Sequence, residues 1–324
     1  MRHLGVTQRQ TRRRWLARVA LLLPVSLATT GCGGGRSSAG RLEKVWGRRG
    51  ISKGRLQKPR AMAIDGQDNV YIVDKTARIQ VFSPDGEYLD RGWQTPEYKN
   101  GKPTGLSFDL QGNLLVADTH YYRILFYSPA GELLKNKTIG GTSGDGGGEF
   151  GWVTDAVQDS QGNYYVAEYG EWDRIQKFSP NGKFLFQWGG HGSEPGQFYR
   201  PQNLAVDQSD HLWVADACNH RIQVFDASGE KQRIVRSWGT EGGEPGQLRY
   251  PWDLVLDENG HVYVSEFGNH RIQKFTFQGE SLGCWGTHGR RGGELYEPWA
   301  LARDSRGRIH VLDTNNHRVQ RITM

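Results

Sequence analysis

The sequence contains little cysteine and no long apolar segment. Only three of its 324 residues are cysteine. Two of these, Cys218 and Cys284, lie in the repeated part of the chain, and no pattern brings them within the ~7 Å Cα separation that a disulfide requires. No apolar run approaches the roughly 18 to 20 residues that cross a membrane as a helix. We therefore expect neither a disulfide nor a membrane-spanning helix.

The sequence has no excess of positive charge outside the N-terminus. The chain carries 41 Lys and Arg against 35 Asp and Glu. Residues 1–31 hold six arginines and no acid, and subtracting them (41 − 6) leaves 35 basic residues against 35 acidic ones. A nucleic-acid-binding protein needs a concentrated positive excess. The composition therefore predicts no nucleic-acid partner.

Residues 1–31 are typical of a bacterial export signal. Arginine-rich residues lead into an apolar stretch at 19–28, which ends in small residues. Residues 11–16 (TRRRWL) are similar to a twin-arginine signal, and residues 29–32 (TTGC) to a lipobox. We expect the protein to be exported and anchored by a lipid on Cys32, on the extracytoplasmic side of a membrane. The alternative is ordinary cleavage after Ala28, which would release a soluble periplasmic protein.

After this signal, the chain divides into a short tether and a repeated region. Residues 32–40 are rich in Gly and Ser and predict a flexible tether. Residues 41–324 contain six copies of one pattern, with a period of about 47 residues. An acid ends the second segment of each copy, at Asp74, Asp118, Glu168, Asp216, Glu266 and Asp313. An arginine opens the third segment, at Arg78, Arg123, Arg174, Arg221, Arg271 and Arg318.

Each copy predicts four short antiparallel strands. Turn sequences such as 83–86 (SPDG) and 179–182 (SPNG) separate the third and fourth segments. A four-stranded unit of this length is typical of a propeller blade. The fold class is therefore all-β, a six-bladed β-propeller.

The last copy predicts how the ring closes. It stops after 318–322 and lacks a fourth strand, whereas residues 42–47 (LEKVWG) resemble the fourth strand at 184–189 (FLFQWG). We therefore expect an N-terminal strand to complete the last blade. Closure also removes the exposed strand edges of an open array.

Three copies carry a recognisable signature, at 219–222 (NHRI), 269–272 (NHRI) and 316–319 (NHRV). They resemble NHL-repeat proteins, and the first three copies depart from the motif. The resemblance implies a propeller that is used for protein or RNA binding, as an extracytoplasmic sensor, or as the scaffold of a metal-dependent amidating lyase. That lyase is expected to hold zinc with histidines at the start of the innermost strands, where this sequence has none. No metal and no cofactor are therefore predicted.

The repeated histidines and tryptophans are interpreted as structural. The Asn-His pairs occupy one position in neighbouring blades, so they are spread around a ring and do not converge on a single ion. The recurring acids and arginines are interpreted as ties within a turn. Tryptophans recur near the end of the fourth strand and are interpreted as core, at Trp46, Trp93, Trp188, Trp238 and Trp285.

Differences between the copies point to the channel mouth. If the first strand of each blade is innermost, the long Gly-rich connections and the turns after the acids share one face, the long-loop face. Loops on a rigid scaffold are where binding residues concentrate. The candidate ligand-binding residues at the start of the innermost strands are Arg60, Thr104, Asp155, Gln202, Asn203, Trp252, Asp253 and Trp299. Aromatic faces beside acids and amides suit a sugar, a peptide or a cation; an inert, hydrated mouth is the alternative.

The predicted function is a monomeric, extracytoplasmic binding or scaffolding protein. Its partner is expected to be a protein, a peptide or a glycan bound by the long-loop face. The alternative is a lyase or hydrolase that uses the acids at the channel mouth, with a bound cation as an option, because paired carboxylates can catalyse acid–base chemistry on any scaffold.

Overall fold

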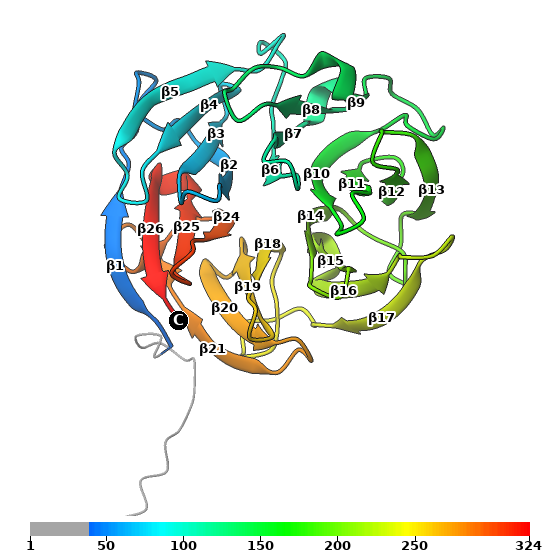
Figure 1. The fold of residues 1–324 in the computed structure, drawn as a ribbon. Helices are drawn as coiled ribbons and strands as arrows, with labels where there is room; N and C mark the ends of the chain where they lie inside the picture. Colours follow the sequence, from blue (N-terminus) through cyan, green and yellow to red (C-terminus); the bar gives the residue numbers. More distant parts are fainter. Residues whose placement is uncertain (1–38) are drawn as a thin grey trace, which may run out of the picture. The chain divides into compact units, whose positions relative to one another are not determined.

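The computed structural model describes residues 39–324. The predicted export signal, Cys32 and nearly all of the tether lie outside the described residues. The described part forms six four-stranded antiparallel sheets around a common centre (Figure 1). Among residues 39–324, no helix has the length and hydropathy of a membrane span. The prediction of a six-bladed β-propeller is confirmed.

The blades follow one another along the chain. Blade 1 contains β2 (Pro59–Ile64), β3 (Val70–Asp74), β4 (Arg78–Phe82) and β5 (Tyr88–Gln94). Blade 2 contains β6 (Gly105–Phe108), β7 (Leu114–Asp118), β8 (Arg123–Tyr127) and β9 (Ile139–Gly140). Blade 3 contains β10 (Trp152–Gln158), β11 (Tyr164–Tyr169), β12 (Arg174–Phe178) and β13 (Phe184–Gly189). Blade 4 contains β14 (Pro201–Val206), β15 (His211–Asp216), β16 (Arg221–Asp226) and β17 (Arg233–Trp238).

Blade 5 contains β18 (Pro251–Leu256), β19 (His261–Glu266), β20 (Arg271–Thr276) and β21 (Ser281–Trp285). Blade 6 contains β24 (Pro298–Arg303), β25 (Ile309–Asp313), β26 (Arg318–Thr323) and β1 (Arg41–Trp46). The short strands β22 (Thr287–His288) and β23 (Glu294–Leu295) pair within the loop between blades 5 and 6. Single 3₁₀ turns lie at η1 (Thr119–Tyr121), η2 (Lys135–Lys137), η3 (Ala217–Asn219) and η4 (Thr314–Asn316).

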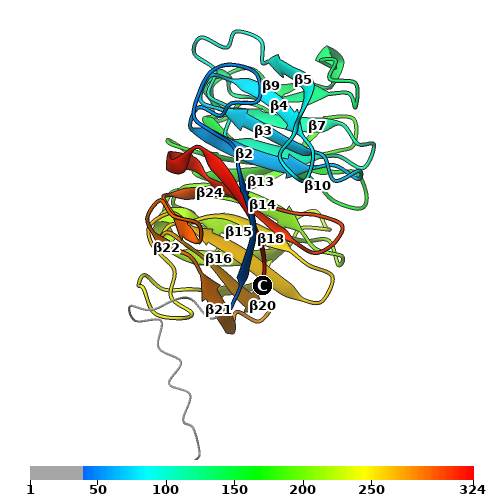
Figure 2. The ribbon, with the colours of Figure 1, turned by 90° about the vertical axis from the view of Figure 1, so that its left-hand side faces the viewer.

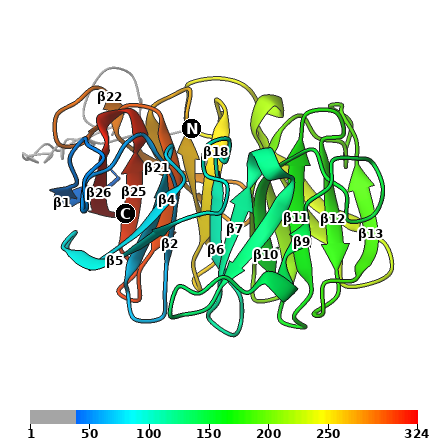
Figure 3. The ribbon, with the colours of Figure 1, turned by 90° about the horizontal axis from the view of Figure 1, so that it is seen from above.

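The first strand of each blade is innermost, which is the arrangement that the expected long-loop face requires. Strands β2, β6, β10, β14, β18 and β24 each contact the corresponding strands of the blades on either side, and they surround the centre in Figure 1. The long connections therefore reach the same face as the turns between the second and third strands. Figure 3 shows the ring from above, after a turn of 90° about the horizontal axis of Figure 1.

Strand β1 completes blade 6, which confirms the predicted closure. It pairs antiparallel with β26, with Arg41 opposite Thr323 and Trp46 opposite Val319. Figure 1 shows β1 in blue outside β26 in red, and Figure 2 views the ring from the side where β24 lies next to β2. Because the two ends of the propeller share one sheet, separating them would unpair a whole strand.

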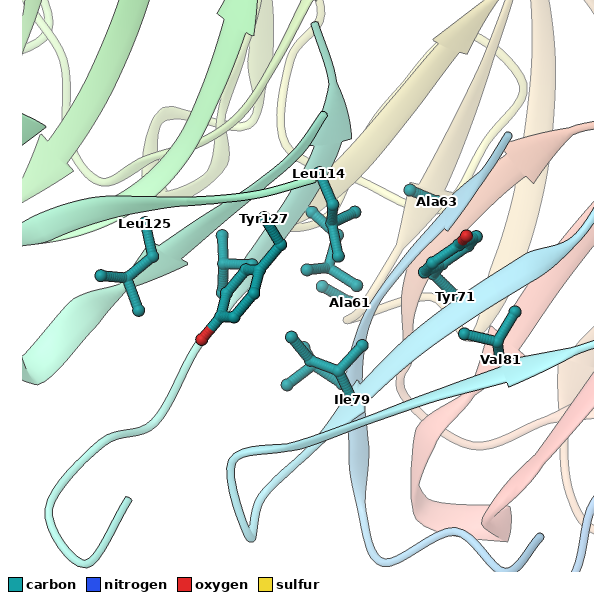
Figure 4. Packing of buried hydrophobic residues seen from close by; sticks show 11 residues of the cluster. Ala61, Ala63, Tyr71, Ile79, Val81, Leu114, Leu125 and Tyr127 are labelled. Carbon is teal, nitrogen blue, oxygen red and sulfur yellow. The ribbon is translucent and has the colours of Figure 1, made fainter. Parts of the chain in front are cut away.

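Apolar side chains fill the spaces between blades. Figure 4 shows the cluster between blades 1 and 2, where Tyr71 and Ile79 face Leu114 and Tyr127. The fourth-strand tryptophans seal these layers from outside; Trp46, for example, is 8% exposed.

One glycine lies where a side chain has no room. The ring of Trp46 packs against Gly86, in the turn of the next blade, and a Cβ at Gly86 would lie 2.3 Å from that ring. The left-handed φ of +83° at Gly86 also favours glycine. The recurring turn glycine therefore serves the packing between blades as well as the turn itself.

The predicted acid–arginine ties are present in all six blades. Each acid is buried. In five blades the arginine also reaches carbonyl oxygens of the preceding long loop, whereas Arg123 in blade 2 pairs with the carboxylate of Glu97 in that loop. Arg318 donates from Nε to Asp313 at 2.6 Å, and from its two Nη atoms to the carbonyls of Arg290, Arg291 and Glu294 at 2.7–2.8 Å. One guanidinium thus fixes a turn and a long loop together, which a point-like ammonium could not do.

The histidines of the NHRI-type motifs fasten neighbouring blades, which confirms their structural interpretation. Nδ1 of His317 accepts the backbone N–H of Lys58 at 2.9 Å, and His220 and His270 accept equivalent N–H groups. Burial lowers the pKa of all three histidines, which keeps Nδ1 unprotonated. In blade 3, Asp173 Oδ1 takes the same role toward the N–H of Arg200.

Candidate binding face around the channel mouth

All eight predicted site residues line one small cavity at the centre of the long-loop face. Its volume is about 20 Å³, which is enough for roughly one water molecule. The sequence-based prediction therefore identifies residues that converge. The space between them does not hold a sugar or a peptide side chain, so a ligand at the mouth must lie on top of these residues.

The polar arc of the mouth connects neighbouring blades. Asp155 Oδ2 accepts the backbone N–H of Leu204 at 3.0 Å and the Nδ2 group of Asn203 at 2.9 Å. Asn203 Oδ1 in turn accepts the N–H of Leu254 at 3.1 Å. Asp253 Oδ2 accepts the N–H of Leu301 at 2.8 Å. Each of the three side chains therefore holds the innermost strand of the next blade; we call Asp155, Asn203 and Asp253 the girdle.

Both girdle acids are buried without a cationic partner in hydrogen-bond range among the described residues. Burial raises the pKa of Asp155 to about 7, against the lowering effect of the N–H groups of Leu204 and Ala156. Burial raises the pKa of Asp253 well above its ordinary value, and the charge of Asp155 raises it further. Near neutral pH both carboxyls therefore retain their protons more than an exposed aspartate does, and they act as hydrogen-bonding groups within the ring.

A row of cations and aromatic rings covers the girdle. Arg60 lies over the ring of Trp299 at 5.6 Å, and that ring is 5.3 Å from Trp252. On the other side, Arg200 lies over Trp252 at 4.7 Å and over Tyr169 at 4.4 Å. The aromatic faces are thus already in contact with the protein's own guanidinium groups. The mouth offers N–H donors more than free ring faces.

Arg200 was missed by sequence reasoning. It precedes Pro201 with a left-handed φ of +63°, and Nε donates to Gln202 Oε1 at 3.1 Å. The position before the proline differs between copies as much as the positions after it, and this variation is the sequence signal that points to Arg200.

A larger hollow lies beside the mouth, over blades 2 and 3. Its volume is about 360 Å³. It is lined by Tyr122, Ser143, Gly151, Trp152, Tyr169, Gly170, Glu171 and Trp172. The ring of Trp152 is 5.2 Å from Tyr169, and 43% of Trp152 is exposed. We call this the aromatic hollow; the sequence analysis did not identify it.

A cleft of about 510 Å³ lies between blades 4 and 5, near the turns opposite the long loops. Its charged lining residues already have partners. His211 Nδ1 lies 3.2 Å from Asp207 Oδ2, Arg236 donates to the carbonyl of Phe277, and Glu258 pairs with Arg303. Of these contacts, the one from Arg236 to Phe277 joins blades 4 and 5, and the one between Glu258 and Arg303 joins blades 5 and 6.

Three further kinds of site are relevant to the described residues: a metal site, a disulfide and a serine-nucleophile turn. Within residues 39–324 no group of three or more His, Cys, Asp or Glu side chains is placed to hold a metal ion, and Cys218 and Cys284 form no disulfide. Residues 50–54 (GISKG) match the spacing Gly-x-Ser-x-Gly. That motif needs a turn from a strand to a helix, whereas here it lies in the loop between strands β1 and β2.

Comparisons with known proteins agree with this architecture. The NHL repeat family matches residues 198–225, 248–275 and 295–322, the copies in blades 4, 5 and 6. The peptidylglycine alpha-amidating monooxygenase of Rattus norvegicus is 38% identical over 131 residues, which are 38% of this chain and 13% of that protein. NHL repeat-containing protein 3 of Homo sapiens is 28% identical over 183 residues, which are 51% of each. The chain thus spans only part of these relatives.

Solved structures share the fold at low sequence identity. An auxiliary nutrient binding protein from Bacteroides thetaiotaomicron superposes with a TM-score of 0.63 at 14% identity, over 83% of this chain and 69% of that one. A streptogramin B lyase gives 0.59 at 12% identity, over 85% and 95%. At such identity the likeness concerns the fold alone. The chain therefore carries NHL repeats within a six-bladed β-propeller.

Proposed function

We propose that this chain is an extracytoplasmic binding or scaffolding protein whose long-loop face recognises a protein, peptide or glycan partner. The observation that carries the proposal is the set of hydrogen bonds that fixes the loops of that face. Arginine ties and histidine contacts hold its loops, so that little order is lost on binding. It also carries exposed or half-buried aromatic rings beside arginines, the side chains that dominate binding interfaces.

The position of β1 supports the proposed anchorage. Trp46 ends β1 at the long-loop face, where the chain enters the loop to β2, so Arg41 lies at the opposite end of the strand. A lipid on Cys32 would attach through residues 33–40 to the side away from the long loops. An anchored propeller would then present its long-loop face to the surroundings of the membrane.

One protein that shares the fold has a name that fits such a role. It is the auxiliary nutrient binding protein from Bacteroides thetaiotaomicron, which is 14% identical to this chain. Our proposal extends binding to this chain on the strength of its own long-loop face.

The enzymatic alternative rests on other relatives, the amidating monooxygenases and the streptogramin B lyase. In that case Asp155 and Asp253 would be the acid–base pair. Both, however, are committed to backbone N–H groups of the next blade. On the long-loop side their cavity has room for about one water, and the channel of about 350 Å³ that both acids also line lies beyond the girdle, along the later residues of the innermost strands. The geometry favours binding over turnover by these acids.

The test is recovery of partners from the native envelope fraction by the full chain. We expect a stable partner to be retained by the wild type and lost when Arg60→Ala and Arg200→Ala are combined. Lys183→Ala, an exposed residue in the turn on the opposite face, should retain it. Equal retention by all three proteins contradicts the proposed face. A turnover activity that Asp155→Asn abolishes in a folded protein favours the enzyme.

A further inference from the structure

We propose that the aromatic hollow is a subsite for a neutral sugar ring of a glycan. The proposal rests on the long-loop face being a binding face and specifies the ligand class for one part of it. The observations that carry it are an open hollow, its exposed tryptophan, and nearby charges of both signs, which together favour a neutral ligand.

Two local departures from the repeat create the hollow. In blade 2, Tyr122 has a left-handed φ of +54° and occupies the position of His220 in blade 4. A tyrosine has no ring nitrogen with which to accept the next blade's N–H, and its ring lines the hollow instead. In blade 3, Glu168 and Arg174 are six positions apart, against five for Asp216 and Arg221. The extra residue lengthens the turn that carries Trp172.

The hollow provides aromatic surface at which a ring can stack. Trp152 is the most exposed of its rings, at 43%. The imidazole of His120 lies nearly parallel to it, with 20° between the planes and 6.3 Å between the centroids, and Tyr169 contacts its other edge. These neighbours hold the indole in one orientation. A pyranose ring has a face of C–H groups that gains dispersion energy against such a surface.

The charges around the rings disfavour a cation. Arg174 lies over Trp172 at 5.3 Å and Arg200 over Tyr169 at 4.4 Å. Neither arginine lines the hollow, so both guanidinium groups contact these rings from outside it. The π-electrons of these rings already interact with a guanidinium group. A ligand cation bound to the same ring would gain less attraction, and the two positive charges would repel each other.

The same surroundings disfavour an anion and provide hydroxyl partners. Glu171 is exposed at the edge of the hollow, and its charge repels a carboxylate or phosphate. Glu171 can accept hydrogen bonds, and the hydroxyls of Ser143, Tyr122 and Tyr169 can donate or accept them. A sugar uses both the stacking and the hydroxyl partners, whereas an apolar peptide side chain would leave the polar groups without partners. The volume of about 360 Å³ lies in the range of small-ligand sites, roughly 300–1,000 Å³.

The test is calorimetric titration of the full chain with a panel of neutral oligosaccharides, covering α- and β-linked hexose and N-acetylhexosamine oligomers. We expect at least one member to bind. Trp152→Ala should weaken its binding about tenfold or more, a loss of about 1.4 kcal/mol or more, and Glu171→Ala should weaken it too. Tyr98→Ala is the matched control, because Tyr98 is 46% exposed in the long loop before blade 2 but does not line the hollow. It should bind as the wild type does.

Each other outcome overturns the proposal. The absence of binding by the whole panel, or binding that Trp152→Ala leaves unchanged, shows that the hollow is not a sugar subsite. Binding of tetramethylammonium or of an apolar peptide that Trp152→Ala abolishes assigns the hollow to another ligand class. Melting curves of Trp152→Ala that match the wild type exclude misfolding. Retention of the envelope partner by Trp152→Ala, with no sugar bound, would refute the sugar subsite and leave the proposed function standing.

Discussion

Replacing Asp155 with asparagine removes one titratable group from the girdle and preserves its shape. Asparagine suits the site, because Asn203 occupies the equivalent position in blade 4 and makes the same contact to the next blade. The amide oxygen can keep the bond from the N–H of Leu204. The substitution therefore removes the buried carboxyl while the contacts between the blades remain, so its effect reports the burial of that carboxyl.

The magnitude follows from the pKa of Asp155, which burial raises from 3.8 to about 7. As the pH rises from about 4 to about 7, the unfolded chain releases this proton while the folded chain retains it. The free energy of unfolding therefore falls over that range and stays lower above it. At about 1.36 kcal/mol per tenfold change in proton affinity, the effect reaches at most about 4 kcal/mol.

Asp155→Asn should therefore be stabilised relative to the wild type at pH 8 and not at pH 4. The gain should grow between these values to an amount on the order of 2–4 kcal/mol. Urea unfolding at a series of pH values measures it.

Asp226→Asn is the control with the opposite sign. The hydrogen bonds from Ser228 lower the pKa of Asp226 to about 2, so the variant should lose stability relative to the wild type as the pH rises from about 2 to about 4, with no further change at higher pH. Parallel stability–pH curves for Asp155→Asn and the wild type would refute the burial of an unpaired carboxyl in the ring.

Two further predictions concern closure and loop anchoring. Trp46→Ala should lower the free energy of unfolding by about 3–5 kcal/mol, because Trp46 is buried between blades 6 and 1 with its ring centroid 5.1 Å from that of Phe82. In the same urea titration, replacing the exposed Trp152 with alanine should lower the free energy of unfolding far less. Equal losses would contradict the closure. Arg318→Lys should lower Tm and speed proteolysis at residues 286–297. The reason is that a lysine cannot hydrogen-bond to Asp313 and to three loop carbonyls at once. A cleavage rate equal to that of the wild type would show that the arginine does not hold the loop.

Much of the fold could be predicted because it repeats. The acids and arginines recur in one register, so six ion pairs were expected from the spacing alone, and the missing fourth strand after Arg318 predicted the pairing of β1. These inferences need only strand order and antiparallel pairing, which a repeat displays six times over. The same logic placed the eight mouth residues together.

What could not be predicted depends on side-chain packing in single copies. The sequence pairs acids with tryptophans at the mouth, but nothing in it shows that Arg60 and Arg200 lie on the tryptophan rings or that the remaining space is about 20 Å³. The aromatic hollow arises from Tyr122 and from one extra residue before Arg174. Both are visible in the sequence as departures from the motif, but their spatial meeting requires the structure.

The central claim is that the long-loop face is the recognition surface. Hydrogen–deuterium exchange of the full chain, with and without a partner recovered from the envelope, tests it most directly. The account predicts slower exchange with partner in the long loops at 47–58, 95–104 and 141–151, and unchanged exchange in the opposite turns at 83–86, 128–131 and 179–182. Protection confined to the opposite turns would contradict it.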